Sequence, residues 1–180
     1  RFKGVPDVEP QPAESVKKMK IDGEFEDWQR VKGYQAIRGN TIHRDSKGWG
    51  DLVYQNKSGR NDIVDVRVAH DKKNVYFYVA CAEPITPSTD RSWMRLYINT
   101  DRKRESGWEG YDFVLNRIAP SAEEIVIERA TSGATWQRAG KVAYSVSENY
   151  MELAIPLELI GLTSEVEFDL EFKWADNMQN

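Results

Sequence analysis

Residues 63–82 read IVDVRVAHDKKNVYFYVACA, and this stretch decides the fold. Two runs rich in β-branched and aromatic residues, at 63–69 and 75–82, flank a polar segment at 70–74. Such runs are typical of β-strands, and Asp and Asn favour turns because their side chains bond the nearby backbone. The stretch therefore predicts two antiparallel strands that pair across a short turn.

The rest of the chain repeats this alternation of short β-type runs and turn residues. We expect further strands at 93–99, 111–117, 124–129, 142–146, 150–155 and 166–174. One helical turn is expected at 157–162, since it follows Pro156 and contains Gly161 near its end, and helix should hold less than about a tenth of the residues. The pattern predicts an all-β fold, a two-sheet antiparallel β-sandwich.

Alternation along each predicted strand separates core positions from outer ones, because successive side chains point to opposite faces. Eight apolar residues are expected to form the core: Phe77, Val79, Leu96, Ile98, Leu153, Ile155, Leu170 and Phe172. The opposite parity places Trp93, Arg95 and Tyr97 on an outer face. In the hairpin it places Tyr76 and Tyr78 on an outer face as well. Rings and charged groups on one face can stack on a sugar and bond its hydroxyls. Ordinary cross-strand pairing is the alternative interpretation.

Length and composition indicate one domain. A chain of 180 residues matches the usual size of a single domain. Residues 1–19 contain three of the seven prolines and little apolar periodicity, which is typical of a linker or extended arm, so we expect the β-sandwich domain at 20–180. The single cysteine, Cys81, can form no internal disulfide and is expected to be buried.

Charge and hydropathy exclude two classes of partner. The formal net charge of −4 disfavours nucleic acid, which requires a basic surface that displaces phosphate counterions. No apolar run approaches the roughly 18 residues that a membrane-spanning helix needs. We therefore expect neither a nucleic-acid partner nor a membrane span.

A search for catalytic residues finds no constellation. Nucleophilic catalysis requires a base beside Ser or Cys, and the two histidines, His43 and His70, fall in a polar loop and in the predicted turn. Glu123 and Glu124 are neighbours on a strand and point to opposite faces, so they cannot flank a glycosidic bond. We expect no enzymatic activity in this chain.

The loop at 99–112 is a candidate calcium site, because calcium takes 6–8 oxygen ligands. Its carboxylates are Asp101, Glu105, Glu109 and Asp112. The spacing differs from that of an EF-hand, and the basic residues at 102–104 would neutralise part of the acidic charge. A solvated, salt-bridged loop is the alternative, and the metal content stays open.

Five segments follow one another in a distinctive order. They read IDGEFEDW at 21–28, NVYFYV at 74–79, WMRLYINTD at 93–101, YDFVLN at 111–116 and MELAIP at 151–156. Together they resemble family 9 carbohydrate-binding modules and the wider DOMON-like group. Asn99 departs from the Asp common in that family, which weakens any metal site there. The end of the chain resembles the family's penultimate strand and loop, so we expect the domain to be truncated at its C-terminus.

The resemblance implies an immunoglobulin-like or jelly-roll sandwich that is appended to a bacterial glycoside hydrolase and binds a glycan or polysaccharide without cutting it. It implies a secreted, periplasmic or cell-surface location, a signal peptide outside this chain and a catalytic domain in the same parent chain. In the family, two aromatic rings clamp the sugar beside polar side chains and an Arg. The nearest candidates for a carbohydrate-binding site are Trp93, Arg95, Trp108, Trp174 and Asn177.

Two other functions remain open at this point. The first is a structural or interdomain sandwich without a ligand of its own, because exposed aromatic patches also mark protein interfaces. The second is a haem-binding electron-transfer domain of the DOMON type. Haem needs axial ligands such as Met with His or Lys, whereas Met94 and Met151 have core parity and His70 falls in a turn.

Overall fold

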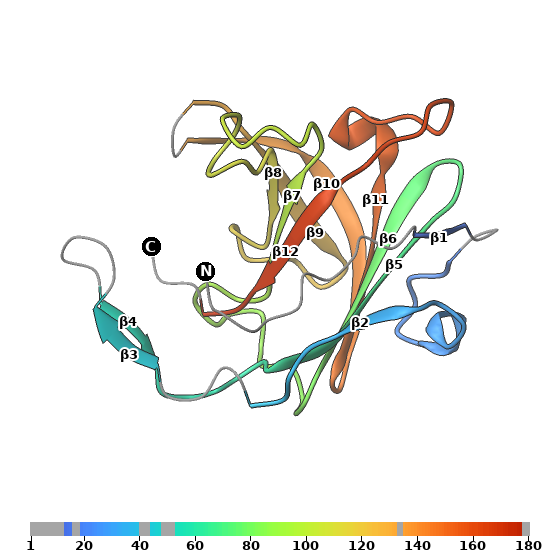
Figure 1. Ribbon diagram of the computed structural model, residues 1–180. Helices are drawn as coiled ribbons and strands as arrows, with labels where there is room; N and C mark the ends of the chain where they lie inside the picture. Colours follow the sequence, from blue (N-terminus) through green and yellow to red (C-terminus); the bar gives the residue numbers. More distant parts are fainter. Residues whose placement is uncertain (1–12, 16–18, 40–43, 48–52, 133–134, 178–180) are drawn as a thin grey trace.

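The computed structural model describes residues 13–15, 19–39, 44–47, 53–132 and 135–177 (Figure 1). Within these ranges the chain contains β-strands and two short 3-10 helices but no α-helix. The predicted all-β class is therefore confirmed. No helix in the described ranges is long and apolar enough to cross a membrane.

The described elements are two short helices and twelve strands. The helices are η1 (Glu26–Trp28) and η2 (Leu157–Ile160). The strands are β1 (Glu14–Ser15), β2 (Gly33–Gln35), β3 (Arg44–Lys47), β4 (Val53–Asn56), β5 (Ile63–His70), β6 (Asn74–Cys81), β7 (Arg95–Asn99), β8 (Phe113–Leu115), β9 (Glu124–Ala130), β10 (Trp136–Ser147), β11 (Tyr150–Pro156) and β12 (Glu171–Ala175).

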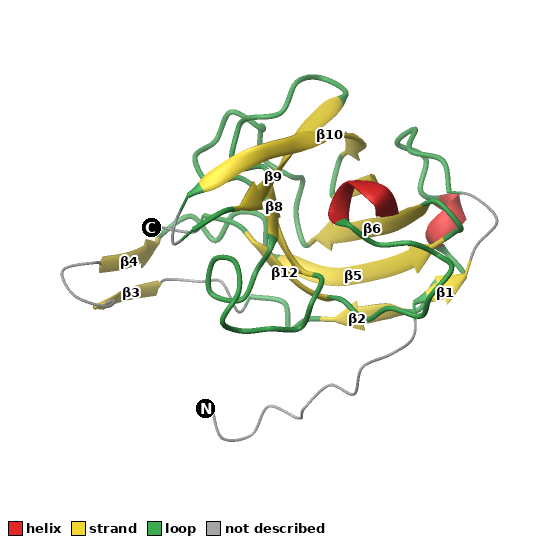
Figure 2. Cartoon of the chain, turned by 90° about the horizontal axis from the view of Figure 1, so that it is seen from above, coloured by secondary structure: helices red, strands yellow, loops and turns green. Residues whose placement is uncertain are grey.

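Ten of the strands form one continuous sheet that curls on itself. Its order is β1-β5-β6-β11-β10-β9-β8-β7-β12, and β2 also pairs with β5. Every pair in it is antiparallel except β1 with β5. The half containing β5, β6 and β11 faces the half containing β7, β8 and β12 (Figures 1 and 2). The two predicted layers are thus the halves of a single curled sheet, while β3 and β4 form a separate projecting hairpin.

The hairpin at 63–82 forms as predicted. Strands β5 and β6 pair antiparallel, and the Asp71 carboxylate closes the turn by accepting hydrogen bonds from the backbone N–H of Lys73 and Asn74, both at 2.7 Å. The predicted helical turn is also present as η2, and Gly161 ends it with a left-handed φ of 73°. Part of the predicted arm is paired with the sheet through β1.

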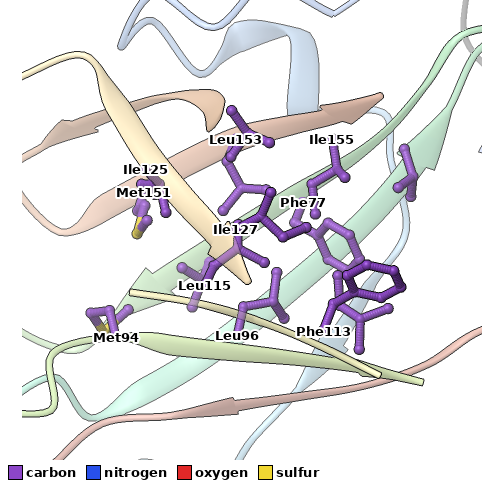
Figure 3. Close-up of a cluster of buried hydrophobic side chains, with 14 of the residues drawn as sticks. Phe77, Met94, Leu96, Phe113, Leu115, Ile125, Ile127, Met151, Leu153 and Ile155 are labelled. Atoms are coloured by element: carbon purple, nitrogen blue, oxygen red, sulfur yellow. The ribbon is translucent and has the colours of Figure 1, made fainter. Parts of the chain in front are cut away.

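The core lies between the two layers of the sheet (Figure 3). Six of the eight predicted core residues are fully buried: Phe77, Val79, Leu96, Ile98, Leu153 and Ile155. Leu170 and Phe172 are only partly buried and pack against the rim of this core. The predicted strand at 166–174 begins only at Glu171, so the alternation read across 166–170 does not apply.

A second, smaller core lies on the outer side of β6. Tyr76 and Tyr78 point outward, as predicted, but they are buried because residues 19–31 fold over them. The Trp28 ring stacks on Tyr78 with 5.4 Å between ring centroids and 30° between ring planes. Residues 19–31 therefore bury the part of the outer face that carries Tyr76 and Tyr78.

Glu152 fixes this cover to β11. Its side chain is 0% exposed, and it accepts hydrogen bonds from the backbone N–H of Asp22 and Gly23 and from Trp28 Nε1, each at 2.9 Å. Burial raises the pKa of Glu152, and these bonds oppose the rise. Gly23 has a φ of 83°, a conformation that favours glycine. The segments 21–28 and 151–156 are therefore parts of one structural unit.

Candidate functional site

The outer face of β7, β8 and β9 is the counterpart of the covered face on β6. Register places Tyr97, Val114 and Glu128 side by side across the three strands. Lys173 on β12 lies opposite Tyr97, and Arg138 on β10 lies opposite Glu128. This row has the parity opposite to the core residues Ile98 and Ile127, so it faces away from the sandwich interior.

Four rings gather on this face and form what we call the aromatic cluster: Tyr97, Trp108, Tyr111 and Trp136. Trp108 stacks on Tyr97 with a centroid distance of 5.3 Å and an interplanar angle of 27°. Tyr111 lies 5.5 Å from Tyr97, and Trp136 lies 6.2 Å from Trp108. Tyr97 is only 2% exposed, whereas the other three rings stay partly exposed. Tyr97 is thus the base of the cluster.

A tight hairpin holds Trp108 in this position. The backbone N–H groups of Trp108 and Tyr111 each donate to the other residue's carbonyl at 2.9 Å. Between them, Glu109 and Gly110 have φ values of 51° and 88°, which is typical of the type I′ turn. Gly107 is also required, since a Cβ there would overlap the Tyr111 carbonyl. The ring is therefore presented on a constrained backbone.

Polar side chains border the cluster. Arg117 forms a two-point ion pair with Glu128, at 2.9 Å from Nε and 2.7 Å from Nη2, and the hydrogen bonds to Glu128 raise the pKa of Arg117. Within the described ranges, Arg95 makes a single side-chain hydrogen bond, of 3.4 Å from Nη1 to the Tyr97 hydroxyl, and its buried Nε has no partner. The face thus retains hydrogen-bonding capacity that the protein does not use.

The five predicted site residues lie on two sides of the sheet. Arg95 and Trp108 are both on the outer face and contact Tyr97. Trp174 pairs with Leu96 on the inner side and packs against the core. Asn177 lies in the loop after β12, where its backbone N–H donates to the Ser92 carbonyl at 3.0 Å.

The prediction that Trp93 faces outward is wrong. Its side chain is 3% exposed within the core, and Nε1 donates to the Thr86 carbonyl at 2.7 Å. The strand begins only at Arg95, because Met94 has a left-handed φ of 39°. Trp93 and Met94 are neighbours that both point inward, which strict alternation forbids.

Sequence reasoning did not include Trp136, Arg117 or Glu128 in the site. Alternation along β9 would have placed Glu128 on the outer face, opposite in parity to Ile125 and Ile127. Alternation could not assign Trp136 to a face, since β10 begins six residues before the strand expected at 142–146. Its place beside Trp108 depends on the order of strands in the sheet.

The candidate calcium loop uses two of its four carboxylates as turn caps. Asp101 Oδ1 accepts from the Lys103 N–H at 2.8 Å and from Ser106 Oγ at 3.0 Å, and the Lys103 bond lowers the pKa of Asp101. Asp112 Oδ2 accepts from Thr100 at its backbone N–H and hydroxyl. Across the described part of the chain, no three Asp, Glu, His or Cys side chains gather as a metal site.

Comparison with known proteins adds no relative. No family model matches the chain, and no curated protein matches it in sequence. The resemblance to family 9 carbohydrate-binding modules therefore stays a prediction that rests on the five segments quoted above.

Proposed function

We propose that the chain is a non-catalytic carbohydrate-binding module and that it binds a glycan on the outer face of β7–β9, around the aromatic cluster. The observation that supports this most is the partly exposed Trp108 ring, stacked on Tyr97 by a constrained hairpin. A flat indole face matches the apolar C–H face of a pyranose. Trp136, tilted by 53° to Trp108, adds a second ring beside it.

Arg95 supplies the polar part of this proposal. Its guanidinium has no carboxylate partner among the described residues, and its Nε lacks any hydrogen bond. An unpaired buried donor costs about 1–3 kcal/mol. A sugar hydroxyl that accepts from Arg95, after a small rotation of the side chain, would remove that cost, and binding then couples ring stacking to hydroxyl recognition.

The wider role follows the resemblance given by the sequence. As a module in a secreted or cell-surface protein, the domain would direct an attached glycoside hydrolase to its polysaccharide. The haem alternative is less well supported, because Met94 and Met151 are both fully buried among core side chains (Figure 3).

An interdomain structural role is the second candidate, and one observation favours it. A cavity of about 570 Å³ opens between β5 and residues 164–172. Val68 and Phe168 contribute to its apolar lining, and Val166 at its rim is 62% exposed. Such a surface suits contact with a neighbouring domain.

The experiment that tests the proposal is a glycan array with the intact chain, followed by titration of Trp108→Ala. We expect this variant to lose binding while its melting temperature stays within a few degrees of wild type, since a partly exposed ring contributes little to folding. Tyr150→Ala is the matched control, because Tyr150 is a ring 38% exposed on the other half of the sheet. It should keep full affinity.

Two outcomes would contradict the proposal. If the Trp108→Ala variant binds the glycan as tightly as the wild type does, the aromatic cluster is not part of the binding site. A wild-type chain that binds no glycan on the array would favour the interdomain role.

A further inference from the structure

A second pocket lies at the same end of the sandwich as the aromatic cluster. It has a volume of about 430 Å³, within the roughly 300–1,000 Å³ typical of small-ligand sites. It lies between β9, β10, η2 and the base of the loop at 99–112. Its polar lining residues are Thr100, Asp101, Asp112, Arg129, Gln137, Arg138 and Glu158.

Two chain segments connect this pocket to the aromatic cluster. On β10, Trp136 belongs to the cluster, whereas the next two residues, Gln137 and Arg138, line the pocket. At the base of the loop, Tyr111 belongs to the cluster and Asp112 lines the pocket. Because successive residues on a strand point to opposite faces, the cluster lies on the outer face and the pocket on the inner face at the same end of the sheet, and a ligand that reaches both has to pass over the strand ends.

The pocket forms where the inner face of the sheet changes from apolar to polar. Register pairs Arg129 with Phe113 on one side and with Gln137 on the other, which gives both polar residues the parity of the core. Further along the same strands these positions hold Ile125, Ile127 and Val142. The Arg129 guanidinium lies over the Phe113 ring, 6.0 Å from its centroid. The core is thus capped at this end by hydrogen-bonding groups.

Three polar side chains of the pocket are unpaired within the part of the chain that the structure describes. Those of Gln137 and Glu158 make no hydrogen bond or ion pair, and Arg129 makes only its contact with the Phe113 ring. Asp101 and Asp112 add carboxylate oxygens at the rim. A strongly charged ligand of either sign would meet like charges here, whereas a neutral sugar hydroxyl can both donate and accept.

We propose that this pocket is a second sugar subsite, and that the ligand is a neutral oligosaccharide that passes from the aromatic cluster over the strand ends at residues 111–112 and 136–137 into the pocket. This rests on the proposed function. The aromatic cluster stacks one sugar ring, and the pocket binds hydroxyls of a sugar further along the chain. Affinity then depends on ligand length.

The test is calorimetric titration of the intact chain with β-1,4-linked gluco-, xylo- and manno-oligosaccharides, from a monosaccharide to roughly a hexasaccharide. We expect the wild type to bind the longer members of one series at least about fivefold more tightly than the shortest, the effect of one net hydrogen bond. The double variant Arg129→Ala/Gln137→Ala should lower the affinity for the long ligands to that for the short ones. The affinity for the short ligands should stay unchanged.

Controls separate this inference from folding effects and from the proposed function. Arg30→Ala removes an exposed Arg on the opposite layer and should change nothing, and Glu158→Gln probes the pocket without removing volume. Affinity that does not grow with length, or a double variant equal to wild type at every length, would overturn the second subsite alone, provided that Trp108→Ala still loses binding. A wild type that binds no member of any series and no glycan on the array would overturn both.

Discussion

The molecule contains two Trp-on-Tyr stacks of nearly equal geometry and different surroundings. Trp28 stacks on Tyr78 at 5.4 Å and 30°, and Trp108 stacks on Tyr97 at 5.3 Å and 27°. Trp28 is 1% exposed and its indole N–H donates to Glu152. Trp108 stays partly exposed, and its indole N–H has no partner in the described ranges. Ring geometry alone does not distinguish a structural stack from a binding surface.

The difference arises from what covers each stack. Met19 and Val31 pack in the same buried cluster as Trp28, and the Glu152 carboxylate satisfies its one polar atom. Trp108 flanks the turn of its own hairpin, and its ring contacts among the described residues are with Tyr97 and Trp136. A covered stack contributes to folding, whereas an uncovered one keeps a ring face available to a ligand.

The largest expected effect is that of Trp28→Ala on stability. Truncation of a fully buried Trp should cost about 3–5 kcal/mol, because it opens a cavity over Tyr78 and removes a donor to Glu152. Urea unfolding followed by circular dichroism measures this cost. Trp108→Ala should lose no more than about 1.5 kcal/mol. Equal losses of stability in the two variants would show that the two stacks contribute equally to folding, which would contradict the comparison.

Glu152→Gln should have an intermediate effect. The substitution keeps the shape but leaves one carbonyl oxygen and an NH₂ group to face three donors, so one donor loses its acceptor. We expect a loss of about 1–3 kcal/mol in the same urea assay. Glu167→Gln changes an exposed carboxylate and should be neutral. A Glu152→Gln variant as stable as wild type would show that the N-terminal cover does not depend on this carboxylate.

The smallest expected effect appears at alkaline pH. Burial raises the pKa of Tyr78 to about 12 from an ordinary 10.0, so the unfolded state ionises before the folded state does. The stabilising contribution is complete below pH 10 and is lost as pH rises toward 12. Burial also raises the pKa of Cys81 to about 12, so the measurement is the difference between wild type and Tyr78→Phe. If wild type and Tyr78→Phe show the same dependence of stability on pH between pH 10 and 12, the Tyr78 stack is not buried.

Much of the fold could be predicted because period-2 alternation reports burial directly. The hairpin at 63–82 and core residues such as Phe77 and Leu96 follow from it. Alternation fails where the backbone leaves the strand, as at Met94, and Trp93 was misplaced for that reason. It also cannot show that Tyr78 is covered, since the cover comes from residues 19–31.

The candidate site was less accessible to sequence reasoning. Parity placed Arg95 on the correct face, and the resemblance to carbohydrate-binding modules singled out Trp108. Their neighbours Trp136 and Glu128 come from β10 and β9. Which strands lie next to β7 is a property of sheet order, and short-range patterns do not contain it.

The most direct test of the central claim is an NMR titration that follows the indole N–H signals of the tryptophans as the glycan selected by the array is added. The account predicts that the signals of Trp108 and Trp136 shift in proportion to occupancy, while those of Trp28 and Trp93 stay in place. A shift confined to Trp28 or Trp93, with Trp108 unchanged at saturation, would contradict it.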